Sequence, residues 1–297
     1  MAKRRKKQSR YAKLRLILSI IVLVLLIAAE LTGNAPWDEE NTGGDPNAQM
    51  EIHMIDVGQG ESILVRSGQE TMLVDAGVRG TGDEIAAYLQ AQGIQKLDRL
   101  LITHDHSDHQ GGLKRLLQDV DTDLLMLYDG GDRDGGYLLA GELAGSSSCD
   151  VAFMEKGQKF TLGDISITVV FPNAGYHNDN LNSMSVVLLL ECGGKRVLLT
   201  GDSTAAAELQ YYEELPRIDV LKLAHHGSGG SNSTEMLQHI RPTMALLSCG
   251  VDNDYGHPHK RVMQDLQDLG VAVYRTDEQG NLLLTLKDGT FTVTTQR

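Results

Sequence analysis

Three histidines and two aspartates lie within six consecutive positions of the chain, directly after a short apolar run. They are His104, Asp105, His106, Asp108 and His109. Neutral imidazole and carboxylate groups are ligands that suit zinc, manganese and iron ions. Since His104 and His106 are two residues apart, both rings can reach one point, and Asp108 and His109 can serve a second point nearby. The spacing therefore predicts a metal site rather than a solvated polar loop.

The segments around this cluster predict how it is held. The apolar run predicts a buried strand, Arg99–Thr103, with the cluster in the loop at its carboxyl end. Gly111 and Gly112 let the next helix start close against that loop. Five further polar groups follow other expected strands, and strand ends are where sites on sheet scaffolds are built. These groups are Ile55–Ser62, Val74–Gly77, Leu199–Ser203, Leu223–Ser228 and Asn253–His259.

Hydrophobic patterning and Gly-rich turns predict an α/β fold with helices outside packed sheets. The expected strands are Glu51–Asp56, Ser62–Arg66, Thr71–Asp75, Arg99–Thr103, Leu124–Tyr128, Val151–Met154, Lys159–Thr161, Ile165–Phe171, Met184–Cys192, Arg196–Thr200, Val220–Ala224, Thr243–Ser248, Val271–Tyr274, Asn281–Leu286 and Phe291–Thr294. The expected helices are Asp83–Gln92, Gly112–Gln118, Gly136–Ala144, Thr204–Glu214, Thr234–Ile240 and Lys260–Leu269.

The H-x-H-x-D-H pattern resembles the metallo-β-lactamase superfamily, which implies a four-layer αββα sandwich with one or two metals between its two sheets. The motifs D-V-G-Q-G-x-S, T-H-x-H-x-D-H, T-G-D, H-H-G-S and Y-G-H-P, in this order, resemble its ComEC-like branch over about residues 50–295. ComEC is the membrane protein of DNA uptake in competent bacteria, and its exported metallo-hydrolase domain carries these motifs. This chain departs from it in having a single hydrophobic segment, so we do not expect it to form the DNA channel. It also has Glu61 where the branch commonly has Asp.

The resemblance implies a set of metal ligands for two divalent ions. These are His104, His106, Asp108, His109, Asp202 and His226. Asp202 would bridge the two cations, since a carboxylate has two oxygens; the alternative is an N-cap for the helix expected from Thr204. His225 could replace His226 as ligand, but adjacent residues leave a strand end in different directions, so one would ligate and the other face substrate. We favour His226 as the ligand.

The expected catalytic residues are Asp108, His257 and His225. Asp108 would hold or deprotonate a water, His257 would act as general acid or phosphate-binding cation, and His225 could also help the leaving group. Asp56 and Asp75 are expected to orient ligating histidines.

Two further residues, Asn182 and Ser228, are expected substrate contacts. Asn182 lies where the superfamily usually supplies another histidine, and it is expected as a weak ligand, a substrate contact or a turn residue. Losing one imidazole makes Mn²⁺ a rival to Zn²⁺. Ser228, in the H-H-G-S motif, is expected beside the substrate. His53, His177 and His239 receive no role.

Charge divides the chain into two regions. Residues 1–31 hold eight basic residues and one acidic residue, and Leu14 to Ala29 is nearly all apolar. This predicts a membrane anchor over residues 1–31 with the amino end inside the cell; a signal peptide cleaved near Ala28-Ala29 is the alternative. Residues 32–49, rich in Gly, Pro, Asn and acids, predict a flexible linker, and residues 50–297 the metallo-hydrolase domain.

The rest of the chain is strongly acidic. Of the total net charge of −13, residues 32–297 contribute −20, from 19 basic and 39 acidic residues. Such a domain repels polyanions, which argues against duplex binding through a basic face and favours single strands, short ends or a small phosphodiester. Cys149, Cys192 and Cys249 form no C-x-x-C pair, so a cysteine zinc knuckle is excluded, while one disulfide remains open.

Together these observations predict an exported, membrane-anchored metal-dependent hydrolase that directs an activated water at a phosphodiester. The resemblance implies DNA or RNA as substrate. One alternative substrate is a phosphorylcholine ester of cell-wall polymer, because similar exported enzymes of this fold cleave it. Another alternative is a non-catalytic member that binds a ligand, which the retention of Asp108, His109 and Asp202 disfavours.

Overall fold

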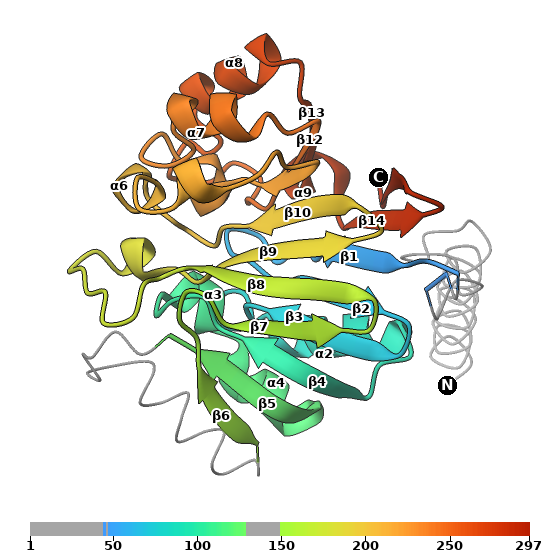
Figure 1. Cartoon of the computed structure of the whole chain (residues 1–297). Coiled ribbons are helices and arrows are strands. Elements are labelled where there is room, and N and C mark those ends of the chain that lie inside the picture. The colour runs from blue at the N-terminus through green and yellow to red at the C-terminus, as the bar shows by residue number, and fades with distance from the viewer. Residues whose placement is uncertain (1–43, 46, 129–148) are drawn as a thin grey trace, which may run out of the picture. The chain divides into compact units, whose positions relative to one another are not determined.

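The computed structural model describes residues 44–45, 47–128 and 149–297, all within one compact unit, Gly43–Arg297 (Figure 1). The predicted anchor at residues 1–31 and the predicted helix Gly136–Ala144 lie outside the described residues. Within the ranges that the structure describes, no helix has the length and hydropathy needed to cross a bilayer.

The first sheet contains eight strands in the order β15-β14-β1-β2-β3-β4-β5-β6. Their bounds are β1 Met50–Met54, β2 Ile63–Ser67, β3 Glu70–Val74, β4 Lys96–Leu101, β5 Asp121–Leu127, β6 Asp150–Phe153, β14 Leu282–Lys287 and β15 Thr290–Thr295. Strands β3 to β6 are parallel, whereas β1 pairs antiparallel with β2 and β14. Because β3 and β4 are parallel neighbours, Asp75 and the segment from His104 to His109 follow them at the same edge.

The second sheet contains seven strands in the order β13-β12-β11-β10-β9-β8-β7. Their bounds are β7 Lys159–Leu162, β8 Ile165–Phe171, β9 Val187–Cys192, β10 Lys195–Leu199, β11 Val220–Lys222, β12 Met244–Leu247 and β13 Ala272–Arg275. Strands β10 to β13 are parallel, so the segments that follow β10, β11 and β12 gather at one edge. These segments carry Asp202, the His225-His226 pair and Ser248.

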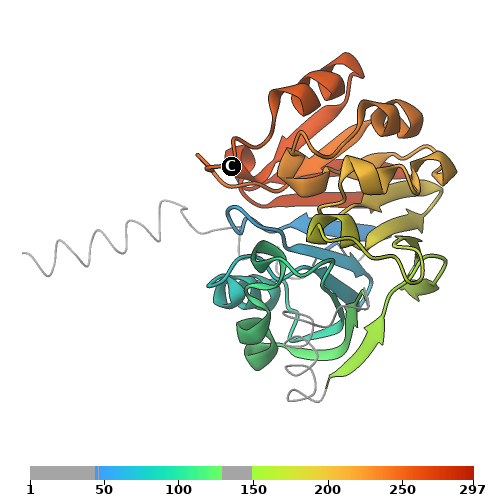
Figure 2. The same cartoon turned by 90° about the vertical axis from the view of Figure 1, so that its left-hand side faces the viewer.

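Helices cover both outer faces (Figures 1 and 2). The α-helices are α2 Gly82–Ala91, α3 Ser107–Gln110, α4 Leu113–Asp119, α6 Ala205–Glu208, α7 Thr234–Ile240, α8 Lys260–Asp268 and α9 Thr276–Gln279. The short 3₁₀ segments are η2 Leu181–Met184, η3 Tyr212–Glu214 and η4 Ala224–Gly227. Leu116 of α4 packs with Leu100 on the first sheet, and Leu237 of α7 packs with Leu221 on the second.

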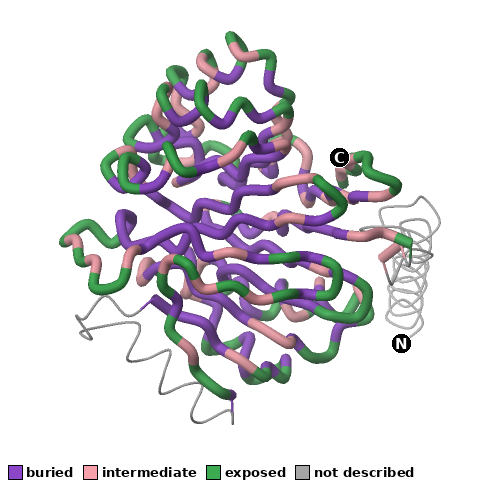
Figure 3. Tube along the Cα trace, in the orientation of Figure 1, coloured by how far each residue is buried: buried purple, intermediate pink, exposed green. Residues whose placement is uncertain are grey.

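Three apolar clusters separate the four layers. The central cluster joins the facing sides of the two sheets, including Ile52, Val65 and Leu188. Their chain neighbours Leu64 and Leu189 point to the outer clusters, under the helices, as the two-residue period of a strand requires. Buried residues accordingly run along the central strands of both sheets (Figure 3). The predicted α/β sandwich of the metallo-β-lactamase fold is confirmed.

Several boundaries differ from prediction. Ser107–Gln110 forms α3 inside the predicted loop, and the predicted strand from Met184 starts only at Val187, because Leu181–Met184 forms η2. The predicted helix Thr204–Glu214 breaks into α6 and η3, since Tyr211 turns into the core and its hydroxyl donates to Ser203 Oγ.

The folded unit also begins before the predicted boundary at Met50. Gln49 N donates to Leu286 O, and Ser67 Oγ donates to Gln49 O. The Asp45 carboxylate pairs with Lys287. The last residues of the predicted linker therefore pack on the sheet. The three cysteines are buried and free, so the disulfide left open by the sequence does not form.

Candidate metal centre

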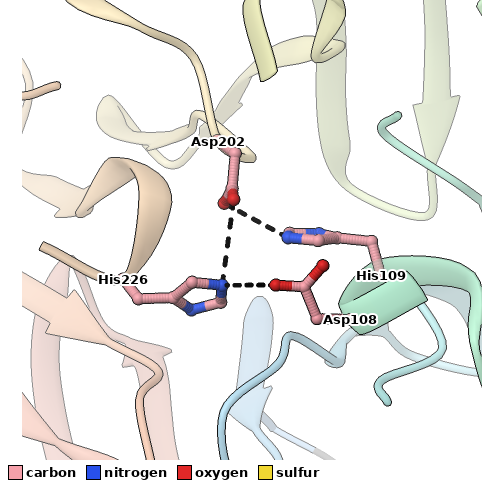
Figure 4. Close-up of side chains that lie close together, drawn as sticks. All are labelled: Asp108, His109, Asp202 and His226. Carbon is pink, nitrogen blue, oxygen red and sulfur yellow. Dashed lines mark ion pairs between the residues drawn. The ribbon is translucent and has the colours of Figure 1, made fainter. Parts of the chain in front are cut away.

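The facing edges of the two sheets bring four ligand-type side chains together (Figure 4). Asp108 and His109 come from α3, Asp202 follows β10, and His226 lies in η4. One donor atom from each lies within 4.8 Å of the others. His109 Nε2 is 3.2 Å from Asp202 Oδ1, and His226 Nε2 is 3.5 Å from Asp108 Oδ2 and 3.8 Å from Asp202 Oδ2.

The His109 ring is oriented by Asp75. Its Nδ1 lies 2.6 Å from Asp75 Oδ2 and donates to that carboxylate, which leaves Nε2 facing Asp202. Asp75 is itself held by the backbone N–H of Thr103 at 2.8 Å and by the Thr103 hydroxyl. Asp75 thus makes the contact with a histidine that the sequence led us to expect, and this contact selects the tautomer that a metal ligand needs.

His225 and His226 leave the chain in different directions. Both have left-handed backbone conformations, with φ of 52° and 53°, which non-glycine residues adopt at a cost of about 1–3 kcal/mol each. His226 is buried, and its Nδ1 donates to Ser248 O at 2.8 Å, so its Nε2 is free to face the carboxylates. His225 is 28% exposed and lies beside Asn182. His225 Nε2 lies 3.7 Å from Asp202 Oδ2, so it is the burial of His226 and its contact with Asp108 that favour His226 as the ligand.

The donor atoms of this group have unmet bonding capacity. His109 Nε2, His226 Nε2 and Asp202 Oδ1 are buried and have no hydrogen-bond partner. Such groups are costly to bury unless something else satisfies them. Two imidazole nitrogens and two carboxylates form a set that suits Zn²⁺, Mn²⁺ or Fe²⁺. The residues present therefore fit a divalent metal ion.

His104 and His106 form a second convergent pair. His104 Nε2 lies 3.0 Å from His106 Nδ1, while His104 Nδ1 contacts the hydroxyls of Thr103 and Ser185. The ring centroids of His104 and His109 are 4.2 Å apart, so this pair adjoins the four-residue group. The six predicted ligands therefore lie together, as two neighbouring sets of donors.

Asp202 is not a helix cap. The N-cap of α6 is Thr204, whose hydroxyl accepts from Ala207 N. Asp202 N donates to Ser185 Oγ, and its carboxylate faces His109 and His226. Gly201 before it has a φ of +49°, and an added Cβ would lie 3.1 Å or less from Ser185 and Thr103, so only glycine fits.

Opposite charges keep the carboxylates ionised. Burial alone would raise the pKa of Asp202, but His109 and His226 outweigh it and hold that pKa well below its usual range. Burial likewise opposes ionisation of Asp108, yet its contacts with His226 and His109 lower its pKa to about 2. Burial lowers the pKa of His109, while Asp202 and Asp75 outweigh it and raise that pKa well above its usual value. A bound cation would take the place of the His109 proton.

A cavity of about 260 Å³ opens beside the metal centre. It is lined by Gln59, His106, Ser107, Asp108, Asn182, Asp202, His225, His226, Tyr255 and His257. None of these ten residues is Lys or Arg. The turn role expected as an alternative for Asn182 belongs to Asn180, which caps η2 by accepting from Asn182 N, whereas the buried Asn182 Oδ1 has no hydrogen-bond partner.

Three sequence-based expectations need correction. Asp56 pairs with Arg297 and accepts from Gly58 N rather than orienting a histidine, because β2 separates its strand from β3. Ser228 Oγ accepts from Gly230 N within its own loop, and Ser228 does not line the cavity. His257 lines the cavity as expected, but burial lowers its pKa to about 4, which argues against a cationic role near neutral pH.

Sequence reasoning missed several residues around the site. Ser185 and Ser248 anchor ligands, and Gln59 accepts from Gly250 N and lies 3.4 Å from His257 Nδ1. The largest omission is Lys222, which is fully buried and pairs with Glu61. A lysine in the apolar run Val220–Ala224 was the available signal, since an unpaired charge is not found in a buried strand.

Comparison with known proteins agrees with this geometry. A family model described as Metallo-beta-lactamase superfamily matches residues 55–238. The chain is similar to ComE operon protein 3 of Bacillus subtilis (strain 168), with 33% identity over 83% of this chain and 34% of that protein. It is also similar to Competence protein ComA of Neisseria gonorrhoeae, with 28% identity over 92% of this chain and 39% of that protein. The chain thus spans about a third of the length of these curated relatives.

Solved structures show the same fold. The metallo-beta-lactamase fold protein YhfI from Bacillus subtilis matches with a TM-score of 0.54 and 16% identity, over 82% of this chain and 99% of that chain. At this identity the match shows the fold alone. With the family model covering the central part of the chain and the ligands gathered at one sheet edge, the chain belongs to the metallo-beta-lactamase superfamily.

Proposed function

We propose that this chain is an exported, membrane-anchored phosphodiesterase that uses two divalent metal ions, zinc or manganese, to hydrolyse single-stranded nucleic acid. One observation carries the hydrolase proposal: two histidines and two aspartates converge beside a cavity, with buried donor atoms that lack partners. The export and anchoring parts rest on the basic, apolar amino-terminal residues.

The side chains around the cavity have different proposed roles. Bound divalent cations would lower the pKa of a water and polarise the scissile phosphoryl group. Asp108, with one oxygen facing His226 and a pKa of about 2, is a charged acceptor that can orient a water. Burial also lowers the pKa of His225, so this partly exposed imidazole is better suited to hydrogen bonding the substrate than to the leaving-group role expected from the sequence. His257 is neutral, so it acts through hydrogen bonds rather than charge.

The lining limits how a phosphodiester substrate could be held. A phosphate diester carries one negative charge, and the ten lining residues supply no Lys or Arg to hold it. Affinity would therefore come from the metal ions and from neutral donors such as Gln59, Ser107 and Asn182. A cavity of about 260 Å³ fits one phosphate with parts of its neighbours, which favours a flexible strand over a rigid duplex.

The position of Tyr255 favours nucleic acid as the class of phosphodiester substrate. The residue is 68% exposed, and its ring stacks on His257, with centroids 5.7 Å apart and planes at 20°. Exposed aromatic rings beside a nuclease cavity offer a face to an unpaired base. The names of the curated relatives, which include a competence protein, agree with a role in DNA handling.

The test is a substrate panel assayed with the full-length chain and added Mn²⁺ or Zn²⁺. The panel contains bis-nitrophenyl phosphate, single- and double-stranded DNA, RNA and nitrophenyl phosphorylcholine. Metal-dependent turnover of bis-nitrophenyl phosphate and faster cleavage of single- than double-stranded DNA are expected. Turnover confined to nitrophenyl phosphorylcholine would assign choline phosphodiesters instead. A purified chain that binds no transition metal and turns over none of these would contradict the proposal and support a ligand-binding member.

A further inference from the structure

A buried ion pair joins the two sheets beneath the metal centre. Glu61 lies in the loop between β1 and β2 of the first sheet, and Lys222 is the last residue of β11 in the second. Both side chains are fully buried, and the Lys222 ammonium contacts Glu61 Oε2. Neither Glu61 oxygen accepts a well-formed hydrogen bond from the part of the chain that the structure describes. The ammonium is therefore the main compensation for this buried carboxylate.

Each end of the pair is tied to a loop that carries metal ligands. Lys222 Nζ donates to Gly201 O at 2.8 Å, and Gly201 directly precedes Asp202. The same carbonyl accepts from His225 N at 3.1 Å, next to His226. At the other end, Glu61 N donates to Asp108 O at 3.1 Å. The pair is thus tied to Asp108 through the Glu61 backbone and to Gly201 O through the Lys222 ammonium, and Gly201 O extends the link to the His225–His226 segment.

The energetics of a buried pair argue against a role in stability alone. Removing two ions from water is costly, and well-packed apolar residues of similar volume often stabilise a protein as well or better. A pair that contributes little net stability but contacts two ligand segments, and reaches a third through Gly201 O, is better explained by the geometry it imposes. We propose that Glu61 and Lys222 form a positioning pair that fixes the spacing of the Asp108 and Asp202 halves of the metal centre.

This inference rests on the metal centre of the proposed function but not on its substrate. Its readout is therefore the affinity for Mn²⁺ alone. This affinity is measured by titration calorimetry on the full-length chain, at a temperature well below the midpoint of thermal unfolding. The main variant is E61Q/K222M, which removes both charges with side chains of similar length. K222M alone is unsuitable, because Glu61, Asp75 and His109 have donor atoms within 4.8 Å of one another and could bind a cation once the ammonium is gone.

We expect E61Q/K222M to bind Mn²⁺ about 10- to 100-fold more weakly, the usual effect of removing groups that orient metal ligands. E61Q alone keeps the bond from Lys222 to Gly201 O. The loss of Mn²⁺ affinity in this variant should therefore be near the lower limit, about tenfold. The matched control is K156M/E214Q, which removes a 2.7 Å ion pair that joins two segments away from the cavity. Its Mn²⁺ affinity should equal that of the wild type.

The outcomes separate this inference from the proposed function. A folded E61Q/K222M variant whose Mn²⁺ affinity is within about twofold of the wild type overturns the positioning role. If that variant does not fold, unchanged affinity in E61Q overturns it equally. A wild-type chain that binds Mn²⁺ but hydrolyses no phosphodiester leaves the positioning pair standing while the proposed function fails. A wild-type chain that binds neither Mn²⁺ nor Zn²⁺ overturns both.

Discussion

Two buried polar clusters lie next to each other at the edges of the sheets, and they are built in opposite ways. In the metal centre, Asp202 and its neighbours leave three buried donor atoms without hydrogen-bond partners. In the positioning pair, the Glu61 oxygens also lack well-formed hydrogen bonds, but the Lys222 ammonium lies beside them and balances the carboxylate charge. The four side chains of the metal centre include no ammonium or guanidinium group. Buried unsatisfied atoms therefore indicate a cation site only where no side-chain cation already balances the carboxylates.

The sharpest way to test this contrast is Asp202→Asn. Asn keeps one carbonyl oxygen but loses the negative charge and the second donor oxygen, so a cation shared through Asp202 should weaken and water activation should fail. We expect turnover of bis-nitrophenyl phosphate to fall on the order of 10³-fold or more while the domain stays folded. Initial rates with saturating Mn²⁺, elemental analysis and circular dichroism check the three parts of this expectation.

The control for Asp202→Asn is Thr204→Ala. Thr204 is the N-cap of α6, so its loss should lower the free energy of unfolding by about 1 kcal/mol and leave metal content unchanged. Near-normal activity of Asp202→Asn with full metal content would remove Asp202 from the metal centre, and the two clusters would no longer differ as described.

A change in the positioning pair should instead affect the stability of the fold. Lys222→Met leaves the Glu61 carboxylate buried without its partner, so the free energy of unfolding should fall by about 3–5 kcal/mol. E61Q/K222M removes both charges and should recover most of this loss. Urea unfolding measures both changes in the free energy of unfolding, provided that the slope of this free energy against urea concentration is the same for all variants. A Lys222→Met chain as stable as the wild type would show that the pair is not the compensated cluster we infer.

The sequence predicted which side chains come together because each lies in a short motif at the end of a strand. His104, His106, Asp108 and His109 are close in sequence, so their spacing alone indicates a metal site. Short apolar runs bounded by Gly-rich turns likewise predicted nearly every strand within a few residues, since central strands of both sheets are buried on both faces. Patterns within short stretches of sequence were therefore sufficient to predict features formed by residues that are close together in the chain.

What the sequence could not supply was contact between distant segments. Asp56 and Asp75 each follow a strand and precede a glycine two residues on, yet only Asp75 meets His109, because β3 is the neighbour of β4 and β1 is not. Glu61 and Lys222 pair across two sheets, and nothing near either residue encodes that meeting. The packing of one sheet against the other decides such contacts, and one amino-acid sequence by itself does not show that packing.

A third buried group, His53, has the Tyr88 hydroxyl beside its Nδ1 and should give a pH effect. Burial lowers its pKa to about 3 from an ordinary value of 6.5, so the folded state keeps it neutral while the unfolded state takes up a proton. Its contribution to stability is complete above pH 6.5 and is lost as the pH falls toward 3. At 1.36 kcal/mol per unit, the loss should be about 2 kcal/mol between pH 6.5 and pH 5.

The difference between wild type and His53→Gln isolates this effect. His53→Gln cannot titrate, so its unfolding free energy should fall less steeply over that range in urea titrations at several pH values. Tyr88→Phe is the matched control, because it removes the hydroxyl 2.8 Å from His53 Nδ1 but leaves the ring buried. Parallel pH curves for wild type and His53→Gln would mean that His53 takes up its proton equally in both states.

The smallest expected effect belongs to Tyr255, which lines the cavity beside the metal centre. Its ring is held on one side by His257, so the free side can stack on one base. Stacking of a base on an aromatic ring contributes about 1–3 kcal/mol, and for a ring this exposed we expect the lower limit, about fivefold in KM. Tyr255→Ala should therefore raise the KM for a short single-stranded oligonucleotide about fivefold without changing kcat. Tyr255→Phe keeps the ring and should behave as the wild type.

An oligonucleotide with an abasic site at the cleaved position offers no base, so its KM should be the same for wild type and Tyr255→Ala. If Tyr255→Ala raises KM equally for both oligonucleotides, the ring supports the loop around His257 and does not read a base.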